Sequence, residues 1–167
     1  MTKKISPEVE KIKSILEKRI LVLDGAMGTM IQGFHLTEAD FRGEIFKNHP
    51  CDLKGNNDIL SLTRPDVIKA VHCKYLEAGS DIIETNTFTA AYYSQADYKT
   101  EKYSYDICYN GARIAREAAD EFTKKTPGKP RFVAGSLGPT NKSLSLSPDV
   151  NDPGYRAVNF DIVYNAY

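Results

Sequence analysis

Polar residues follow three apolar segments of the sequence, and their types suit the binding of a small charged molecule. Asp24 and Gly25 end the first apolar run, Asn86 and Thr87 end the second, and Gly138 lies just beyond the third. A carboxylate can accept hydrogen bonds from an ammonium group, and turns that contain glycine expose backbone N–H groups that can hold a carboxylate. The pattern therefore predicts a pocket for a small zwitterion. The spacing alone leaves open the alternative that Asp24 and Asn86 only cap the turns that follow them.

Alternating strands and helices are expected to position these polar residues. Apolar runs predict buried strands at 20–23, 81–86 and 131–136, and apolar residues at three- and four-residue spacing predict helices at 6–16, 63–79, 104–123 and from 152 onward. Strands that alternate with helices form parallel sheets with right-handed crossovers. Because the carboxyl ends of parallel strands meet at one edge, we expect Asp24, Asn86 and Gly138 to lie around one mouth.

The fold class that this order predicts is α/β, the N-terminal portion (about three βα units) of a (β/α)8 TIM barrel with long loop insertions. Three parallel strands are few for an open sheet, and the last helical pattern stops at Tyr167 without a cap or glycine. We therefore expect an N-terminal helix within residues 1–19 and a partial barrel domain, truncated at its C-terminus, over residues 20–167.

Three further features carry specific expectations. Residues 30–60 are polar and irregular, which predicts a long insertion of the kind that forms lids or binding loops. Glu84 shares a strand face with Asn86 and requires a cation or several donors nearby, whichever face of the sheet it occupies. The helix at 104–123 is expected to bury a stripe of six residues, namely Tyr105, Cys108, Ala112, Ala115, Ala119 and Phe122.

Composition excludes several classes of function. The chain has 22 Lys and Arg residues against 22 Asp and Glu residues, so its formal net charge is zero, and bulk charge favours neither nucleic acid nor an anionic membrane as a partner. No apolar run is long enough to span a bilayer, and the first residues lack the apolar core of a signal peptide. A cytoplasmic location is the expectation.

Familiar metal, nucleotide and hydrolase signatures are missing from the sequence. Cys51, Cys73 and Cys108 are odd in number and widely spaced, which predicts reduced thiols rather than a disulfide framework or a CxxC metal site. The histidines form no HExxH pattern, and His72 is expected to be packed or on the surface. The spacing of Gly25–Gly28 is GxxG, which is not a nucleotide-binding pattern, and no GxSxG element is present.

Five segments in order carry a resemblance to a known family. Three of them resemble the zinc-dependent homocysteine S-methyltransferases, and two resemble the cobalamin-dependent methionine synthases within that group. The first three are LDGAMGT at 23–29, DIIETNTF at 81–88 and VAGSLGPT at 133–140; the other two are GNNDILSLTRPDV at 55–67 and LSPDVNDP at 146–153. The resemblance runs from about residue 18 to the end of the chain.

The resemblance implies that homocysteine is the substrate and that the product is methionine. It implies that Asp24 and Gly25 contact the amino-acid end of homocysteine, with Asn86, Thr87 and Gly138 lining the same mouth. Zinc would activate the homocysteine thiol, which takes the methyl group of methylcobalamin, and 5-methyltetrahydrofolate would recharge the corrinoid. The partners implied are the cobalamin and folate domains of the parent chain.

The sequence differs from the family pattern in the cysteines that hold the zinc. The family holds its zinc with three cysteines, two of them adjacent, and no Cys-Cys pair occurs in this sequence. The zinc ligands are therefore expected beyond residue 167, no residue is assigned a catalytic or metal role, and the chain alone is expected to be inactive. Two alternatives stay open: a homocysteine methyltransferase that uses betaine or S-methylmethionine, and a non-catalytic truncated module for binding or assembly that self-associates.

Overall fold

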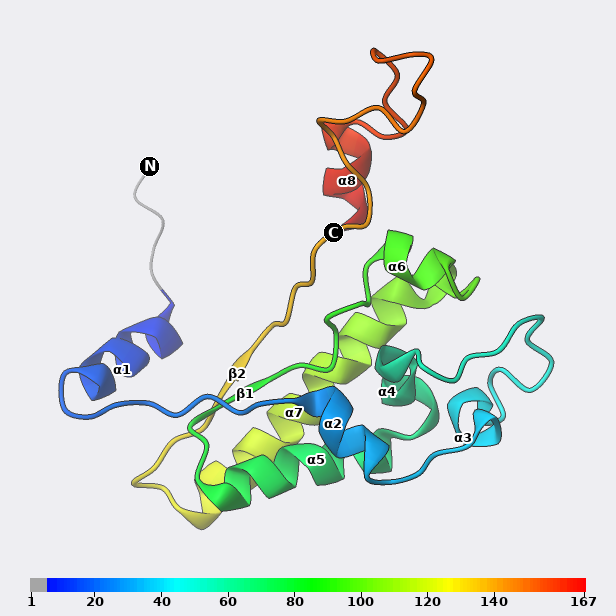
Figure 1. Cartoon of the computed structure of the whole chain (residues 1–167). Coiled ribbons are helices and arrows are strands. Elements are labelled where there is room, and N and C mark those ends of the chain that lie inside the picture. Colours follow the sequence, from blue (N-terminus) through cyan, green and yellow to red (C-terminus); the bar gives the residue numbers. More distant parts are fainter. Residues whose placement is uncertain (1–5) are drawn as a thin grey trace.

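The structure, a computed structural model (Figure 1), describes residues 6–167 and has an α/β architecture with short strands. Helices dominate the described part of the chain. In order, its elements are α1 (Pro7–Leu16), α2 (Met27–Gln32), α3 (Glu38–Arg42), η1 (Asn57–Ile59), α4 (Leu60–Thr63), α5 (Pro65–Ala78), β1 (Ile82–Glu84), α6 (Tyr92–Ala96), η2 (Glu101–Tyr103), α7 (Ser104–Lys125), β2 (Phe132–Ala134) and α8 (Phe160–Ala166).

Three parallel segments form the sheet, in the order 22–24, β1, β2. β1 pairs with β2 in parallel, with Ile83 opposite Val133. On the other edge of β1, Leu23 forms a parallel bridge with Ile82, and the Asp24 N–H donates to the Ile82 carbonyl at 2.9 Å. The prediction of three parallel segments joined by helices is therefore confirmed for the described chain, although these segments form an open sheet and no closed barrel.

The first segment is not buried, which corrects the prediction for residues 20–23. Ile20 is 85% exposed and Val22 is 52% exposed. Their apolar character predicted burial, but the helices α5 and α7 lie together on one side of the sheet (Figure 1). An apolar run shows that a segment suits a core, while burial also requires neighbouring elements to cover it.

Ile83 anchors the sheet on its helical side. Its side chain is fully buried against Leu76 of α5 and the small residues Ala115, Ala118 and Ala119 of α7. α5 begins at Pro65 and ends before Gly79, whose φ of 110° provides the left-handed helix end that the sequence predicted. The alternation of side chains along β1 then places Ile82 and Glu84 on the opposite face of the sheet.

The buried stripe of α7 differs from its prediction in the first half of the helix. Ile107, Gly111 and Ile114 are buried there, whereas Tyr105 is 77% exposed and Cys108 and Ala112 are also exposed. The second half matches, because Ala115, Ala119 and Phe122 are buried as expected. Alanine is only weakly hydrophobic, so it adds little to the periodic signal of a helix. The predicted buried face and the observed one, which is shifted by one residue, therefore had nearly equal support from the sequence.

Residues 30–60 are part of the hydrophobic core and not a lid, which corrects the first half of that prediction. Phe41, Phe46, Leu53 and Ile59 are at most 4% exposed and pack in one cluster with Ile68 of α5 and other residues of α5 and α7. The polar residues of this segment stabilise its turns. Arg42, for example, bonds Glu38 at 2.6 Å and the His49 and Cys51 carbonyl oxygens at 2.7 and 2.9 Å.

His72 is packed inside the core. Its side chain is fully buried, and neither ring nitrogen has a hydrogen-bond partner. Burial without a partner disfavours the charged ring and lowers the pKa of His72 to about 4. The ring is therefore neutral at physiological pH and fills space between helices, and it takes no part in a metal site.

The last helix starts later than the sequence predicted. Asp152 and Pro153 lie in a turn, and α8 begins at Phe160, where the Asn159 side chain accepts the Ile162 N–H at 2.9 Å. Asparagine is a good N-terminal cap because its side-chain oxygen replaces a missing backbone acceptor. In the described residues, no helix combines the length and the apolar character that crossing a membrane requires.

Candidate functional site

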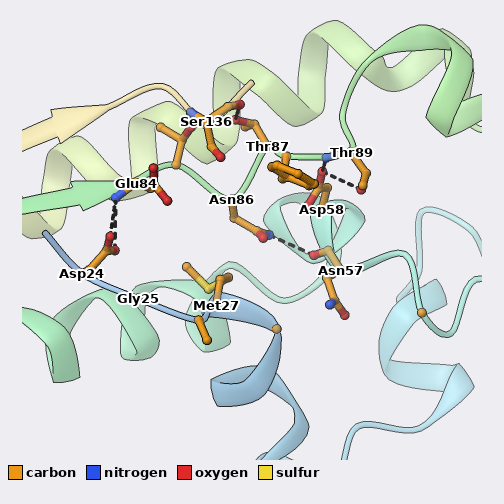
Figure 2. Close-up of a pocket in the computed structure, with 15 residues that line it drawn as sticks. Asp24, Gly25, Met27, Asn57, Asp58, Glu84, Asn86, Thr87, Thr89 and Ser136 are labelled. Atoms are coloured by element: carbon orange, nitrogen blue, oxygen red, sulfur yellow. Dashed lines mark hydrogen bonds between the residues drawn. The ribbon is translucent and has the colours of Figure 1, made fainter. Parts of the chain in front are cut away.

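A cavity of about 490 Å³ opens where the parallel segments end (Figure 2). Its walls come from four places in the sequence: residues 24–28, residues 55–58, residues 84–89 and Ser136. The sequence predicted that Asp24, Gly25, Asn86 and Thr87 meet at one mouth, and the structure brings all four to this cavity. The insertion also contributes a wall, so its expected role as a binding loop is consistent with the structure although its role as a lid is not.

Asp24 lies at the point where the first segment leaves the sheet. Both oxygens of its carboxylate lie 3.1 Å from the Glu84 N–H, and its own N–H is bonded to Ile82 (Figure 2). Burial raises the pKa of Asp24 to about 6, and the nearby negative charge of Glu84 adds to this rise. Asp24 is therefore a carboxylate whose charge depends on pH in the physiological range.

Glu84 projects toward the cavity from the face of β1 opposite the helices. The sequence required a cation or several donors beside it, but Glu84 is exposed and has no salt-bridge partner among the described residues. Water can therefore solvate this carboxylate, and the expectation of a cation or several donors beside it is wrong for the described residues. Asp24 and Glu84 together give this side of the cavity a negative potential.

Asn86 and Thr87 are held by hydrogen bonds to surrounding segments. The Asn86 side-chain N–H2 group donates to the Asn57 carbonyl at 2.9 Å and to Ser61 Oγ at 3.2 Å. Thr87 Oγ1 donates to the Ser136 carbonyl at 2.8 Å and lies 2.6 Å from Thr85 Oγ1, which accepts the Ser136 N–H at 2.9 Å. These bonds fix the turn after β1 against both α4 and the end of β2.

Asp58 is a cavity residue that sequence reasoning missed. It is 3% exposed, and one of its oxygens accepts the Thr89 N–H at 2.5 Å and the Thr89 hydroxyl at 2.9 Å (Figure 2). Burial raises its pKa above the usual aspartate range. The available signal was the polar Asn56-Asn57-Asp58 directly before a buried apolar pair, a boundary between polar and apolar residues like that at Asp24 but in the reverse order.

Gly138 does not line this first cavity, and of the other predicted site residues it shares its own cavity with Thr87 alone. It lines a neighbouring cavity of about 340 Å³ together with Phe88, Tyr105, Cys108 and Tyr167. A β-carbon at Gly138 would overlap the Phe88 carbonyl oxygen, so glycine is required for the loop after β2 to approach the turn after β1. Gly138 thus supports the wall of the first cavity from behind and does not line it.

Replacement of Gly138 by alanine is expected to lower the free energy of unfolding by about 3 kcal/mol, because the clash is with backbone atoms that cannot rotate away. Urea unfolding followed by circular dichroism measures this loss. Gly135→Ala is the matched control, since nothing lies within 4 Å of a β-carbon at Gly135 in the same loop. Equal unfolding midpoints for the two variants would contradict the role of Gly138.

Hydrogen-bond acceptors and donors lie in different parts of the cavity wall. The charged side chains that line it are carboxylates only, from Asp24, Asp58 and Glu84. The backbone N–H groups of residues 25–28, which also line it, have no hydrogen-bond partner among the described residues. A ligand with one ammonium and one carboxylate group can satisfy both kinds of group, which is the chemistry of a free amino acid.

The described residues do not fit a zinc site. No group of three His, Cys, Asp or Glu side chains within residues 6–167 is arranged to hold a metal ion. Cys51 lies in the insertion and its thiol donates to the Tyr98 carbonyl at 3.2 Å, while Cys73 and Cys108 lie on α5 and α7. A structural or catalytic zinc needs three or four close ligands, so no step of a reaction is assigned to zinc here.

Comparison with known proteins finds one family and several similar crystal structures. The family model described as homocysteine S-methyltransferase matches residues 21–167. Crystal structures of the homocysteine methyltransferase MmuM from Escherichia coli are similar in fold, at 26% identity and a TM-score of 0.59 for the oxidized form, which covers 77% of this chain and 40% of that chain. The metallated form matches at 24% identity and a TM-score of 0.58, with 77% and 41% covered.

The family match covers the segments that build the cavity. The family match spans nearly the entire described chain, and it includes the Asp24, Asn86 and Ser136 segments that build the cavity. The chain spans about two-fifths of the length of the MmuM structures. The chain belongs to the homocysteine S-methyltransferase family.

Proposed function

We propose that this chain supplies the amino-acid end of the substrate pocket in a methyltransferase that converts homocysteine to methionine. The observation that carries the proposal is the cavity with carboxylates on one part of its wall and free backbone N–H groups on another. Asp24 would accept from the ammonium group of homocysteine, and the N–H groups that begin at Gly25 would hold its carboxylate. Family membership supports homocysteine as the amino acid concerned.

The other predicted residues have distinct parts in this proposal. Asn86 and Thr87 line the cavity and would contact the substrate or hold the turn that does. Gly138 would act indirectly, because it allows the loop after β2 to pack on Phe88 behind the cavity wall. Asp58 would join them by fixing Thr89 at the far side of the same turn.

The methyl donor is proposed from the sequence alone. The segments at 55–67 and 146–153 resemble cobalamin-dependent methionine synthases, which favours methylcobalamin recharged from 5-methyltetrahydrofolate by other domains of the parent chain. In this proposal the zinc ligands lie outside residues 6–167, since the described residues do not fit them. A homocysteine methyltransferase with another donor is the second candidate, because the family match and the similarity to the homocysteine methyltransferase MmuM concern the homocysteine enzyme and leave its methyl donor open.

Calorimetric titration of the chain with L-homocysteine, in reducing buffer with a chelator, tests the proposed pocket. We expect saturable binding of one homocysteine per cavity, and much weaker binding of N-acetylhomocysteine, which lacks the ammonium group. Equal binding of the two compounds would contradict a role for the carboxylates. Sedimentation of the same sample shows whether exposed Ile20 and Val22 pair two copies, which the assembly alternative requires.

A further inference from the structure

Helix α7 approaches the cavity wall most closely at Gly111. This glycine is buried, and a β-carbon added to it would lie 2.8 Å from Thr87 Cγ2, 3.4 Å from the backbone carbonyl oxygen of Asn86 and 3.5 Å from Ser61 Oγ. Carbon atoms in ordinary contact are at least about 3.5 Å apart. All three neighbours belong to the cavity wall or to the residues that hold it, so α7 packs directly against the side of the wall that faces away from the cavity.

Ser61 and Asn57 fix which end of the Asn86 amide faces the cavity. The Asn57 carbonyl can only accept a hydrogen bond, so the group 2.9 Å from it must be the N–H2 end of Asn86. Its second hydrogen is directed to Ser61 Oγ at 3.2 Å, and Ser61 is 2% exposed. The side-chain oxygen Oδ1 of Asn86 has no partner among the described residues, and it is the end left for a ligand (Figure 2).

Thr87 cannot move aside without breaking other bonds. Its side chain is branched at the β-carbon and has few allowed rotamers. Its hydroxyl is bonded to the Ser136 carbonyl at 2.8 Å and to Thr85 Oγ1 at 2.6 Å, so rotation of the side chain would break both contacts. A methyl group at position 111 would therefore displace the turn itself, together with the neighbouring Asn86.

We propose that Gly111 and Ser61 are positioning residues that aim the side-chain oxygen Oδ1 of Asn86 into the cavity. This role rests on the proposed binding of an amino acid. It adds to that proposal the residues that determine whether Asn86 presents a hydrogen-bond acceptor or a donor to the cavity. Asn86 then presents an acceptor, which favours a ligand group that donates hydrogen bonds, such as an ammonium. Gly111 and Ser61 do this from α7 and α4, without lining the cavity themselves.

The variant Gly111→Ala tests the assignment, with Gly111→Ala/Thr87→Ser as its rescue. Serine at position 87 keeps the hydroxyl and removes the methyl group that would clash, so space is restored. We expect Gly111→Ala to raise the homocysteine dissociation constant about tenfold or more, since small displacements of a binding group carry large costs. The double variant should return to within about threefold of the Thr87→Ser single variant, by the same reasoning on restored geometry.

One further measurement and one control variant separate positioning from general damage. The side-chain amide resonances of Asn86, recorded by NMR without ligand, should shift in Gly111→Ala and in Ser61→Ala and recover in the double variant. Gly128→Ala is the matched control, because nothing lies within 4 Å of a β-carbon there, and it should alter neither readout. If Gly111→Ala does not fold, Ser61→Ala and the double variant still report on the Asn86 amide.

The outcomes distinguish this inference from the proposed function. Tight homocysteine binding by Gly111→Ala with unshifted Asn86 resonances would overturn the positioning role. Failure of the unaltered chain to bind homocysteine would instead refute the proposed function, and the ligand-free resonances of Asn86 would still test the contact between Gly111 and the wall. Equal loss of binding in the single and double variants would also overturn the inference, because the clash with Thr87 would not be its cause.

Discussion

Replacement of Asp24 by asparagine is expected to weaken homocysteine binding about a hundredfold, which corresponds to about 2.7 kcal/mol. Asparagine keeps the size of the side chain and can still accept from the Glu84 N–H, so the fold is preserved. What is lost is the negative charge that would pair with the ammonium group in a half-buried position. Titration calorimetry of the variant against the unaltered chain measures the effect.

The affinity for homocysteine measured as a function of pH is a second test of the role of Asp24. Because burial raises the pKa of Asp24 to about 6, the carboxylate is ionised above that pH and protonated below it. Affinity for homocysteine should be constant between about pH 7 and pH 8, where its ammonium group stays protonated, and fall about tenfold at pH 5. The Asp24→Asn variant has no charge to lose, so its weaker affinity should not change across this range.

Two control variants show whether Asp24 is the group responsible. Asp97 is exposed and lies outside the cavity, so Asp97→Asn should bind homocysteine like the unaltered chain. Glu84→Gln should keep the fall in affinity below pH 6, since Asp24 is still present. A fall in affinity that persists in Asp24→Asn would assign the titration to a different group and contradict the prediction.

Replacement of Asp81 by asparagine is expected to lower the free energy of unfolding by about 2 kcal/mol. Asp81 is 1% exposed, receives two hydrogen bonds from the Arg19 guanidinium at 2.7 and 2.8 Å, and accepts the Val22 N–H at 2.9 Å. The bonds to Arg19 and Val22 lower the pKa of Asp81 to about 2. The side chain of Arg19 is 40% exposed and keeps contact with water, so the cost stays below that of a fully buried pair.

The sign of the pH effect follows from this lowered pKa. A carboxyl group whose pKa is lower in the folded protein stabilises the fold above its unfolded pKa of about 4, and the stabilisation is lost as the pH falls toward about 2. Urea unfolding at pH 7 and pH 3 should therefore show a smaller difference in Asp81→Asn than in the unaltered chain, as far as this one group is concerned.

A surface ion pair provides the control for Asp81. Asp120 bonds Arg116 at 2.8 Å on α7, but its side chain is 53% exposed. Water screens such a pair, so Asp120→Asn should change the free energy of unfolding by about 0.5 kcal/mol at most. Equal effects of the two substitutions would show that the bonds from Arg19 and Val22 to Asp81 do not hold the first segment to the sheet.

Local sequence patterns predicted the ends of a helix correctly where a single residue type determines the end. α5 begins at Pro65 and ends at Gly79 as expected, because proline and a left-handed glycine act on their own turn of helix. The stripe of α7 and the start of α8 were wrong by one residue and by about two turns, because alanine-rich and polar stretches carry little periodic signal.

The site was predictable to the extent that it depends on strand ends. Asp24, Asn86 and Thr87 each follow an apolar run, and parallel strands bring such positions to one edge. Asp58 was missed because its function depends on Thr89, which is far from it in the sequence and bonded to it only in the fold. The same holds for Gly111, whose importance comes from what lies against it and not from its helix.

The sequence by itself determined the family, the chemistry of the strand ends and the absence of adjacent zinc-binding cysteines, because these depend on residue types and their order. Only the tertiary structure decided that Gly138 lies behind the cavity wall, that Glu84 is exposed to the cavity and that the insertion is core. The physical reason is that burial and contact depend on which segments, distant in the sequence, pack together. A local sequence pattern does not specify which distant segment will pack against it.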